Sequence, residues 1–316
     1  MATIGKDIEK ASELLRKGQL VSIPTETVYG LAANGLDPIA VAKIFEVKKR
    51  PFFNPLILHI GHLDQVAQLT TGLNSKTFDL LEALWPGPVT VLLPKSGLVP
   101  EITVAGNTKV AIRMPNHPLA LKLLKNIDFP LAAPSANPFG YISPTDAGHV
   151  QTQLGRSIEY ILDGGACKVG IESTIIEPMG EECNVLRYGG MPVKNLERFF
   201  KTVHHKTHGN SNPLAPGMLD KHYSPNTPFE LYAHGEKPPM SHNGLYILFT
   251  DMMTEVPVDR KLILSPMGNM AEAASNLFKF MRQADEGKWN KIYATKVPNE
   301  GLGMAINDRL NRAAHQ

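Results

Sequence analysis

Residues 37–60 read DPIAVAKIFEVKKRPFFNPLILHI. Asp37 followed by Pro38 is typical of a helix start, with an N-cap residue and then a proline in the first turn. The next apolar residues recur at helical spacing, and Pro51 ends the pattern. The apolar residues 56–60 then predict a short buried strand. A helix that leads directly into a buried strand is the basic alternation of an α/β fold.

The same alternation extends from this stretch in both directions. A helix that begins at Ile8 precedes an apolar strand at residues 20–23. Further strands are expected at 89–93, 109–112, 130–133, 160–162, 173–176 and 184–186, and further helices at 75–84, 118–125 and 145–153. The pattern predicts a twisted open sheet, mixed or parallel, with helices, in a domain of residues 1–200. The order of the strands does not follow from the sequence.

The second part of the chain predicts a linker and a smaller domain. Residues 201–226 are rich in His, Asn, Pro, Gly and Ser and lack apolar periodicity, which is typical of a connecting segment. Beyond this linker, strands are expected at 229–232, 244–249, 261–264 and 291–294, with a helix around 271–282. Residues 227–316 therefore predict a second α/β domain, as the length of 316 residues also suggests.

Composition indicates an ordinary globular chain. The 32 Lys and Arg against 30 Asp and Glu give a net charge of +2, which indicates neither a nucleic-acid binder nor a membrane binder. Cys167 and Cys183 have no CxxC spacing, so we expect reduced thiols and no redox motif. The charged N-terminus and the absence of an apolar run of about 18 residues predict a cytoplasmic protein without membrane contact.

Three patterns resemble known motifs but lack residues that the chemistry needs. Residues 70–77 resemble a P-loop, but Thr70 and Ser75 stand where glycine is required. His204, His205 and His208 have no acidic or cysteine partner at ligand spacing, so no metal site is predicted. No Gly-x-Ser-x-Gly elbow occurs, although chain order does not exclude a triad assembled in space.

Basic side chains gather where predicted strands and helices end, which is where α/β folds bind ligands. Lys48 and Arg50, with Asn54 nearby, offer a point charge, a planar fork and an amide, and Arg113 and Arg187 add two cations. This set suits an anionic ligand with several oxygens. The alternative for the basic run at 48–50 is a helix C-terminus whose charges only stabilise the helix dipole.

Short polar side chains accompany these cations. Their hydroxyl and amide groups can donate to phosphate oxygens or hold a small polar ligand. The residues concerned are Thr25, Thr27, Ser135, Asn137, Ser143 and Ser173. Most of them lie beside prolines or in turns, so local turn chemistry is the alternative for each.

Several of these motifs together resemble the YrdC-like enzymes, in the long two-domain form called threonylcarbamoyl-AMP synthase. In the first domain the motifs are PTETVYGL at 24–31, KKRP at 48–51, NPL at 54–56, WPGPVT at 85–90, VAIRMP at 110–115, PSAN at 134–137, SPT at 143–145 and ESTI at 172–175. LAPGM at 214–218 and HYSP at 222–225 resemble the linker of that form. Phe139 stands where serine is usual, and Leu219-Asp220 where a more basic pair is common.

The resemblance implies a fold and a reaction. The fold is a YrdC-like domain followed by a small Rossmann-like C-terminal domain. The reaction combines L-threonine, bicarbonate and ATP, with Mg²⁺, into threonylcarbamoyl-AMP, pyrophosphate and water. The product supplies a downstream threonylcarbamoyl transferase complex that modifies a tRNA adenosine to threonylcarbamoyladenosine.

The resemblance also assigns roles to individual residues. It assigns ATP to Lys48, Arg50, Asn54, Ser135, Asn137, Ser143, Arg187, His222 and Tyr223. It assigns threonine to Thr27, His59, Arg113 and Ser173. Lys48 and Arg50 are expected to be catalytic, because negative charge develops on the pyrophosphate leaving group. The linker is expected to act as a lid, with His222 or Tyr223 reaching the nucleotide.

Two other functions compete with this interpretation. A nucleic-acid-binding module would also present a basic surface, although the small net charge predicts only weak, salt-sensitive RNA binding. Another carbamoyl or adenylyl transferase could use the same pocket for a different acceptor.

Overall fold

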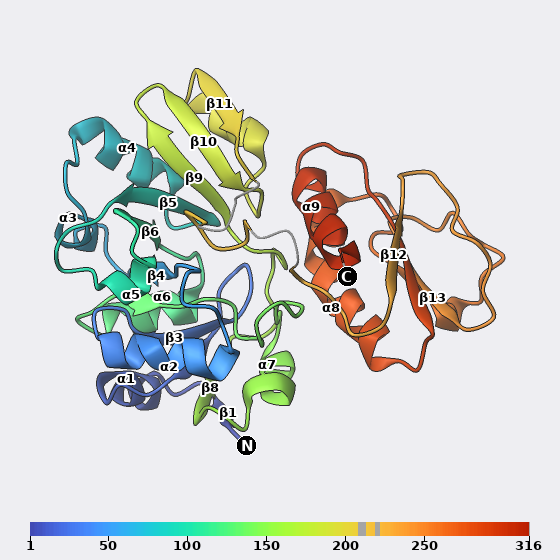
Figure 1. Ribbon diagram of the computed structural model, residues 1–316, viewed down its shortest axis with the longest axis horizontal. Coiled ribbons are helices and arrows are strands. Elements are labelled where there is room, and N and C mark those ends of the chain that lie inside the picture. The colour runs from blue at the N-terminus through green and yellow to red at the C-terminus, as the bar shows by residue number, and fades with distance from the viewer. Residues whose placement is uncertain (208–212, 219–221, 316) are drawn as a thin grey trace.

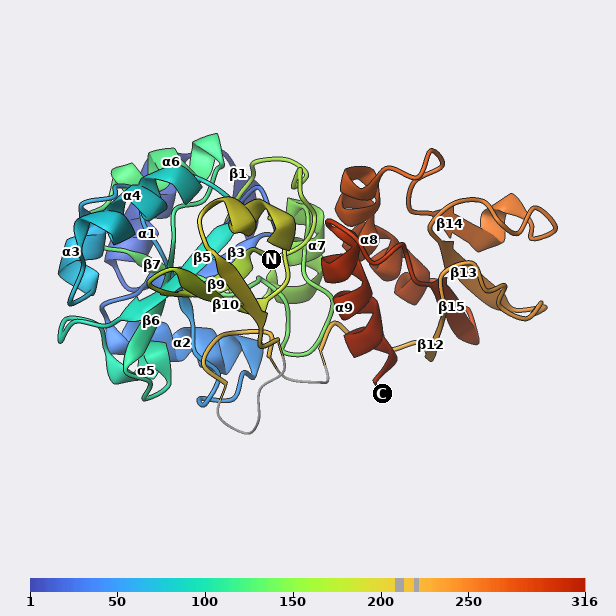
Figure 2. The same ribbon diagram turned by 90° about the horizontal axis from the view of Figure 1, so that it is seen from above.

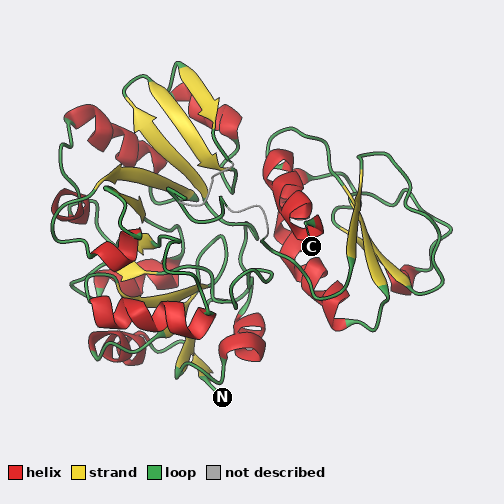
Figure 3. Ribbon diagram, viewed as in Figure 1, coloured by secondary structure: helices red, strands yellow, loops and turns green. Residues whose placement is uncertain are grey.

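The structure, a computed structural model, describes residues 1–207, 213–218 and 222–315. Figure 3 shows two groups of strands, one in each domain, with helices between them. The first domain contains a large mixed sheet, and the second contains a small parallel one.

Eleven strands form the first sheet of the described residues. Their order is β1-β8-β2-β3-β7-β4-β6-β5-β9-β10-β11, with both parallel and antiparallel neighbours. They are β1 (Thr3–Gly5), β2 (Val21–Ile23), β3 (Gly30–Asn34), β4 (Ile57–His59), β5 (Val89–Pro94), β6 (Lys109–Arg113), β7 (Leu131–Ala132), β8 (Tyr160–Leu162), β9 (Thr174–Met179), β10 (Glu182–Arg187) and β11 (Thr202–His205). The predicted α/β fold with a mixed sheet is confirmed.

Helices cover both faces of this sheet, as the view from above shows (Figure 2). They are α1 (Ile8–Arg16), α2 (Pro38–Lys48), α3 (Gln65–Leu69), α4 (Ser75–Leu84), α5 (Glu101–Val104), α6 (Pro118–Lys125) and α7 (Ala147–Leu154), with a 3₁₀ helix, η1, at Val193–Arg198. The alternation along β3 explains the two layers. Leu31 and Ala33 belong to the core under α2, whereas Ala32 belongs to the core under α1.

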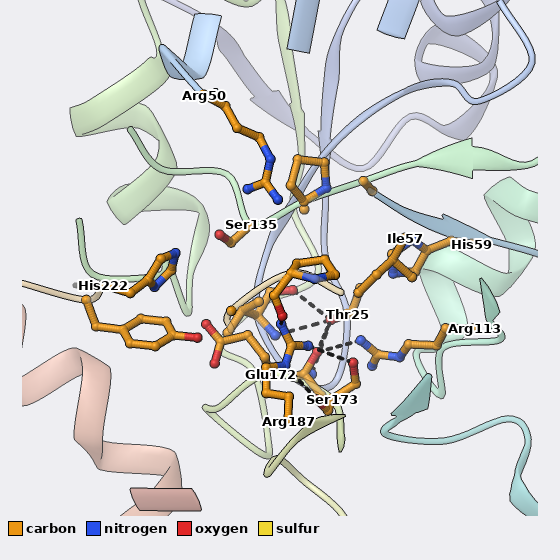
Figure 4. A pocket seen from close by; sticks show the side chains of 18 residues that line it. Thr25, Arg50, Ile57, His59, Arg113, Ser135, Glu172, Ser173, Arg187 and His222 are labelled. Atoms are coloured by element: carbon orange, nitrogen blue, oxygen red, sulfur yellow. Dashed lines mark hydrogen bonds between the residues drawn. The ribbon is translucent and has the colours of Figure 1, made fainter. Parts of the chain in front are cut away.

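The end of α2 places the basic residues that the sequence singled out. Asp37 caps the helix, since its carboxylate accepts from the backbone N–H of Ile39 at 2.9 Å. Lys49 ends the helix with a left-handed φ of 52°. The chain turns there, so that Arg50 points away from the helix axis into the interior of the domain (Figure 4).

The second domain is the smaller α/β unit that the sequence predicts. Its parallel sheet has the order β12-β15-β13-β14. The elements are β12 (Phe229–Tyr232), β13 (Gly244–Leu248), η2 (Val258–Arg260), β14 (Lys261–Ile263), α8 (Met270–Glu286), β15 (Lys291–Thr295) and α9 (Gly303–Ala314). Figures 1 and 2 both show α8 and α9 between this sheet and the first domain.

The two domains share a hydrophobic core. Val28, Ile142 and Ile171 of the first domain belong to the same buried cluster as Leu277 and Phe278 of α8. Polar contacts accompany this cluster. Side chains of α8 form hydrogen bonds with residues 141–143, and a side chain of α9 forms hydrogen bonds with residue 172. The second domain is therefore packed against the first through its helices.

The start of the expected linker differs from the sequence-based expectation. Residues 202–205, which the sequence places in the linker, form β11 and pair in parallel with β10. The strand is short, polar and half-exposed at the edge of the sheet, so it carries little apolar pattern. None of the described helices is both long and apolar enough to span a membrane.

Candidate active site

A cavity lies where loops and strand ends of the first domain meet the linker. Nine of the thirteen residues that the family resemblance assigns to ATP or threonine line it. They are Thr27, Arg50, His59, Arg113, Ser135, Ser173, Arg187, His222 and Tyr223. Figure 4 shows Arg50, Arg113 and Arg187 approaching the cavity from three sides. The other four assigned residues, Lys48, Asn54, Asn137 and Ser143, are not lining residues. Lys48, Asn54 and Ser143 contact the lining residues Ser135, Arg50 and Glu172 from behind.

Arg50 is buried and held in place by the loop that follows it. Its Nη2 donates to Oδ1 of Asn54 at 2.6 Å and to the carbonyl of Pro55 at 2.9 Å. Burial, and then the nearby cation of Arg187, lower the pKa of Arg50 to about 9. A bound anion would relieve both effects, because it would compensate the buried positive charge.

Lys48 points to backbone carbonyls. Its Nζ donates to the carbonyl of Ser135 at 2.5 Å and to the carbonyl of Asn137. Burial and then Arg50 hold the pKa of Lys48 well below its usual value. In this arrangement Lys48 connects the end of α2 to the loop at 135–137, so it positions Ser135 at the cavity.

Arg113 lies at the end of β6 and is fixed by the loop between β2 and β3. Its Nη1 donates to Oγ1 of Thr27 at 2.9 Å, and its Nη2 lies 2.6 Å from a carboxylate oxygen of Glu26. Thr27 Oγ1 is in turn 2.8 Å from Oγ1 of Thr25. These contacts hold the guanidinium in one orientation at the cavity.

His59 is the neighbour of Arg113 across the parallel pair β4 and β6. Burial, and then the charge of Arg113, lower the pKa of His59 to about 3, so its imidazole is neutral near pH 7. Its Nδ1 is buried and has no hydrogen-bond partner among the described residues. The ring of His59 lines the cavity beside Arg113.

Arg187 ends β10 and is held against the segment before β9. Its Nη2 donates to Oγ of Ser173 at 3.0 Å, and its Nε donates to the carbonyl of the same residue at 3.1 Å. Ser173 Oγ also lies 2.7 Å from Oγ1 of Thr90. Burial lowers the pKa of Arg187 to about 10. As for Arg50, an anionic ligand would compensate this charge.

Glu172 is a lining residue to which the sequence gave no role. Its Oε1 accepts from the hydroxyl of Ser143 at 2.6 Å, and its Oε2 accepts from Arg309 of α9. Burial alone would raise the pKa of Glu172, but Arg309 and Arg187 outweigh burial and keep it below its usual value. The motif at 172–175 contained this residue, whereas nothing in the sequence paired it with Arg309.

The linker closes one side of the cavity. Ala215 and Met218 pack on a cluster of sheet residues that includes Ile57 and Leu186. Further along, the ring of Tyr223 stacks on Phe278 of α8 with 5.3 Å between centroids. Burial lowers the pKa of the adjacent His222 to about 3. The linker thus contributes side chains to the cavity wall.

Metal-ligating residues do not gather anywhere in the described part of the chain. Within residues 1–207, 213–218 and 222–315, no group of three His, Cys, Asp or Glu side chains could hold a metal ion. His204 Nε2 lies 3.1 Å from Glu182, and His205 Nδ1 lies 2.9 Å from the hydroxyl of Tyr188. His208 lies outside the described residues.

Comparisons with known proteins cover both domains. Residues 13–189 match the family described as "Telomere recombination", and residues 191–315 match the family described as "Threonylcarbamoyl-AMP synthase, C-terminal domain". The threonylcarbamoyl-AMP synthase of Pyrococcus abyssi is 38% identical over 97% of this chain and 94% of its own length. That of Bacillus subtilis is 37% identical over 99% of this chain and 94% of its own length.

A solved structure shows the same arrangement of the whole chain. The crystal structure of Pyrococcus abyssi Sua5 complexed with L-threonine matches with a TM-score of 0.89 and 34% identity. The match covers 99% of this chain and 97% of that one. Both domains therefore have the same architecture in the two proteins.

Proposed function

The chain belongs to the two-domain family of threonylcarbamoyl-AMP synthases, and we propose that its cavity joins L-threonine, bicarbonate and ATP into threonylcarbamoyl-AMP. The observation that carries this proposal is the convergence of three buried arginines, Arg50, Arg113 and Arg187, on one cavity. Glu172 is the one acidic side chain among the described lining residues, and it is already paired with Arg309. Glu26, behind the wall, pairs with Arg113, so the positive charge in excess is that of Arg50 and Arg187, which suits a triphosphate.

The side of the cavity near the end of α2 and the linker suits the nucleotide. Arg50 and Arg187 are the guanidinium groups that would hold the phosphates, with the hydroxyl of Ser135 beside them. Lys48, which was expected to be catalytic, is not a lining residue and donates to the carbonyls of Ser135 and Asn137, so its role would instead be to position that loop. Asn54 would position Arg50, while Asn137 and Ser143 support the adjoining loops. His222 and Tyr223 would cover the nucleotide from the linker.

The side of the cavity near β4 and β6 suits threonine. Arg113 would bind its carboxylate, because its guanidinium is held by Thr27 and faces the cavity. The neutral imidazole of His59 lines this side of the cavity and would contact the threonine. The hydroxyls of Thr27 and Ser173 complete this subsite. The related Pyrococcus protein was crystallised with L-threonine.

The reaction then proceeds in two bond-forming steps. The threonine amine adds to the carbon of bicarbonate and water leaves, which gives a carbamate. A carbamate oxygen attacks the α-phosphorus of ATP in line, and the bond to the β-phosphate oxygen breaks with its electron pair going to pyrophosphate. Arg50 and Arg187 would stabilise the charge that develops on this leaving group. Magnesium would enter with ATP, mainly coordinated by its phosphates.

The surroundings of this reaction follow from its substrates and product. The product is a mixed anhydride that water destroys, so a transferase acting on tRNA would have to take it over. Direct binding of RNA to this chain would be weak and salt-sensitive, given the net charge of +2. ATP as a substrate, together with the free Cys167 and Cys183, supports a cytoplasmic location.

The proposal is tested by measuring pyrophosphate release from ATP and Mg²⁺. Release should require both L-threonine and bicarbonate, and omission of either should abolish it. Serine should replace threonine poorly, because the missing methyl group changes binding by about 1 kcal/mol or somewhat more. Release without threonine would indicate a different acceptor and would contradict the proposed substrate.

A further inference from the structure

Arg309 is a fully buried side chain of the second domain that reaches the wall of the candidate active site. It lies on α9 and is separated from Glu172 by 137 positions in the sequence. Its Nε and Nη2 donate to Oε2 of Glu172 at 3.1 and 3.0 Å. Two donors on one carboxylate oxygen, both inside the protein, make this a strongly oriented ion pair.

Two further contacts connect Arg309 with other parts of the wall. Its Nη1 donates to the carbonyl of Tyr188 at 2.5 Å. Tyr188 directly follows the lining residue Arg187 in the sequence. Its guanidinium carbon lies 5.4 Å from the centre of the ring of Tyr223, which also lines the cavity. One side chain of the second domain thus contacts three segments of the active site.

We propose that Arg309 is a positioning residue for adenylate synthesis, through which the second domain completes the active site. The inference rests on the proposed function and extends it to the role of the second domain. Arg309 neutralises Glu172, so that Arg187 stays available for the anionic substrate. It also keeps Tyr223 at the cavity.

The electrostatics of the wall explain why this pairing matters. Glu172 lies close enough to Arg187 for the two charges to interact. In the structure the hydrogen bonds of Arg187 go to Ser173 and Pro216. Without Arg309, Glu172 would be a buried carboxylate with too little compensation, and Arg187 is the cation next to it. Glu172 would then compete with the triphosphate for Arg187, and its negative charge would repel the triphosphate.

The test compares steady-state kinetics of the full-length variants. Arg309→Ala should raise the KM for ATP by about tenfold or more, since a cation of the binding site is lost to Glu172. Arg309→Lys should recover only part of this loss, because an ammonium group does not reproduce the two parallel donors. In Arg309→Ala/Glu172→Gln the competing charge is gone, so the KM should fall back toward the wild-type value.

Asp285→Ala is the matched control. Asp285 of α8 also bridges the domains, accepting from the hydroxyl of Tyr141 at 2.6 Å and from the N–H of Thr227 at 2.7 Å. Neither partner is among the described lining residues. This variant should lower the melting temperature but leave the KM for ATP unchanged. A purely structural role of Arg309 would give the same result for Arg309→Ala and would overturn the inference.

Failure of the inference differs from failure of the proposed function. If wild-type protein releases pyrophosphate only with threonine and bicarbonate, and Arg309→Ala has the wild-type KM, the inference alone is wrong. If the wild-type protein does not release pyrophosphate, the dissociation constant for ATP, measured by calorimetry, replaces the KM for ATP. Arg309→Ala should then bind ATP more weakly than the wild type does. The double variant Arg309→Ala/Glu172→Gln should bind ATP more tightly than Arg309→Ala does. Should Arg309→Ala not fold, Arg309→Lys with and without Glu172→Gln gives the same comparison.

Discussion

Arg50 combines burial, a fixed orientation and an uncompensated charge at the cavity. Asn54 and Pro55 supply its hydrogen bonds, and they are neutral groups. We therefore predict that Arg50→Ala lowers the rate of pyrophosphate release by about 100-fold or more, because charge on the leaving group is no longer stabilised. Arg50→Lys should restore little of the rate, since a point charge does not replace a planar fork.

The rate is measured beside the thermal melting curve of each variant. A folded Arg50→Ala protein with an unchanged rate would contradict the role of this residue in catalysis. A loss confined to the KM for ATP would instead assign Arg50 to substrate binding alone.

Single residues also show how far a sequence can specify a site. Arg50, Arg113 and Arg187 were found because cations at the ends of predicted elements are visible in the sequence, and the structure brings them to one cavity. The direction of Lys48 was not visible, because the carbonyls that it contacts belong to a loop almost 90 positions away. The role of Glu172 depends on Arg309, which no local pattern connects to it.

Among the elements around the cavity, the linker segment before His222 depends on one glycine. Gly217 has a φ of 85°, in the left-handed region, and a Cβ there would lie 2.8 Å from Cδ of Arg187. We predict that Gly217→Ala destabilises the protein by roughly 1 kcal/mol through backbone strain. It should also raise the KM for ATP, because the side chain of Arg187 has to move.

Gly235→Ala separates these two effects. Gly235 has a nearly equal φ of 82°, and its Cβ would meet no atom within 4 Å in the described residues. This control should show a similar loss of stability in a thermal melt and the wild-type KM for ATP. Equal KM values in the two variants would mean that the close approach of Gly217 to Arg187 does not matter for binding.

The elements that the sequence predicted are those with local signals. Asp37 and Pro38 mark the start of α2, and the apolar run after Pro55 marks β4. The expected elements did not include α9, because Asn307, Arg309 and Arg312 occupy buried positions and interrupt its apolar stripe. These polar residues face inward because they bind groups outside the helix, as Arg309 binds Glu172. Such a helix is recognised only once its partners are known.

At the scale of the whole molecule, the shared core couples the two domains. Ile142 and Ile171 of the first domain pack in one buried cluster with Phe278 and Ile306 of the second. The buried ion pair between Glu172 and Arg309 lies across the same boundary. Domains joined by small polar interfaces tend to move and unfold separately, whereas a large apolar interface favours a single transition. We therefore expect the chain to unfold as one unit.

The two tryptophans allow this expectation to be tested, because Trp85 lies in the first domain and Trp289 in the second. In Trp85→Phe the fluorescence reports on Trp289, and in Trp289→Phe it reports on Trp85. In each variant, the midpoint of thermal unfolding measured by fluorescence should equal the midpoint measured by circular dichroism.

A substitution in the shared core makes the test independent of the reporters. Phe278→Ala should cost about 3–5 kcal/mol, because it removes a fully buried ring that stacks on Tyr223. In the Trp289→Phe background the added Phe278→Ala change should lower the midpoint that Trp85 reports, although Trp85 lies in the other domain. If Trp85 kept its midpoint while the circular dichroism signal showed an earlier partial loss, the domains would unfold independently. The second domain would then not stabilise the active site through the shared core.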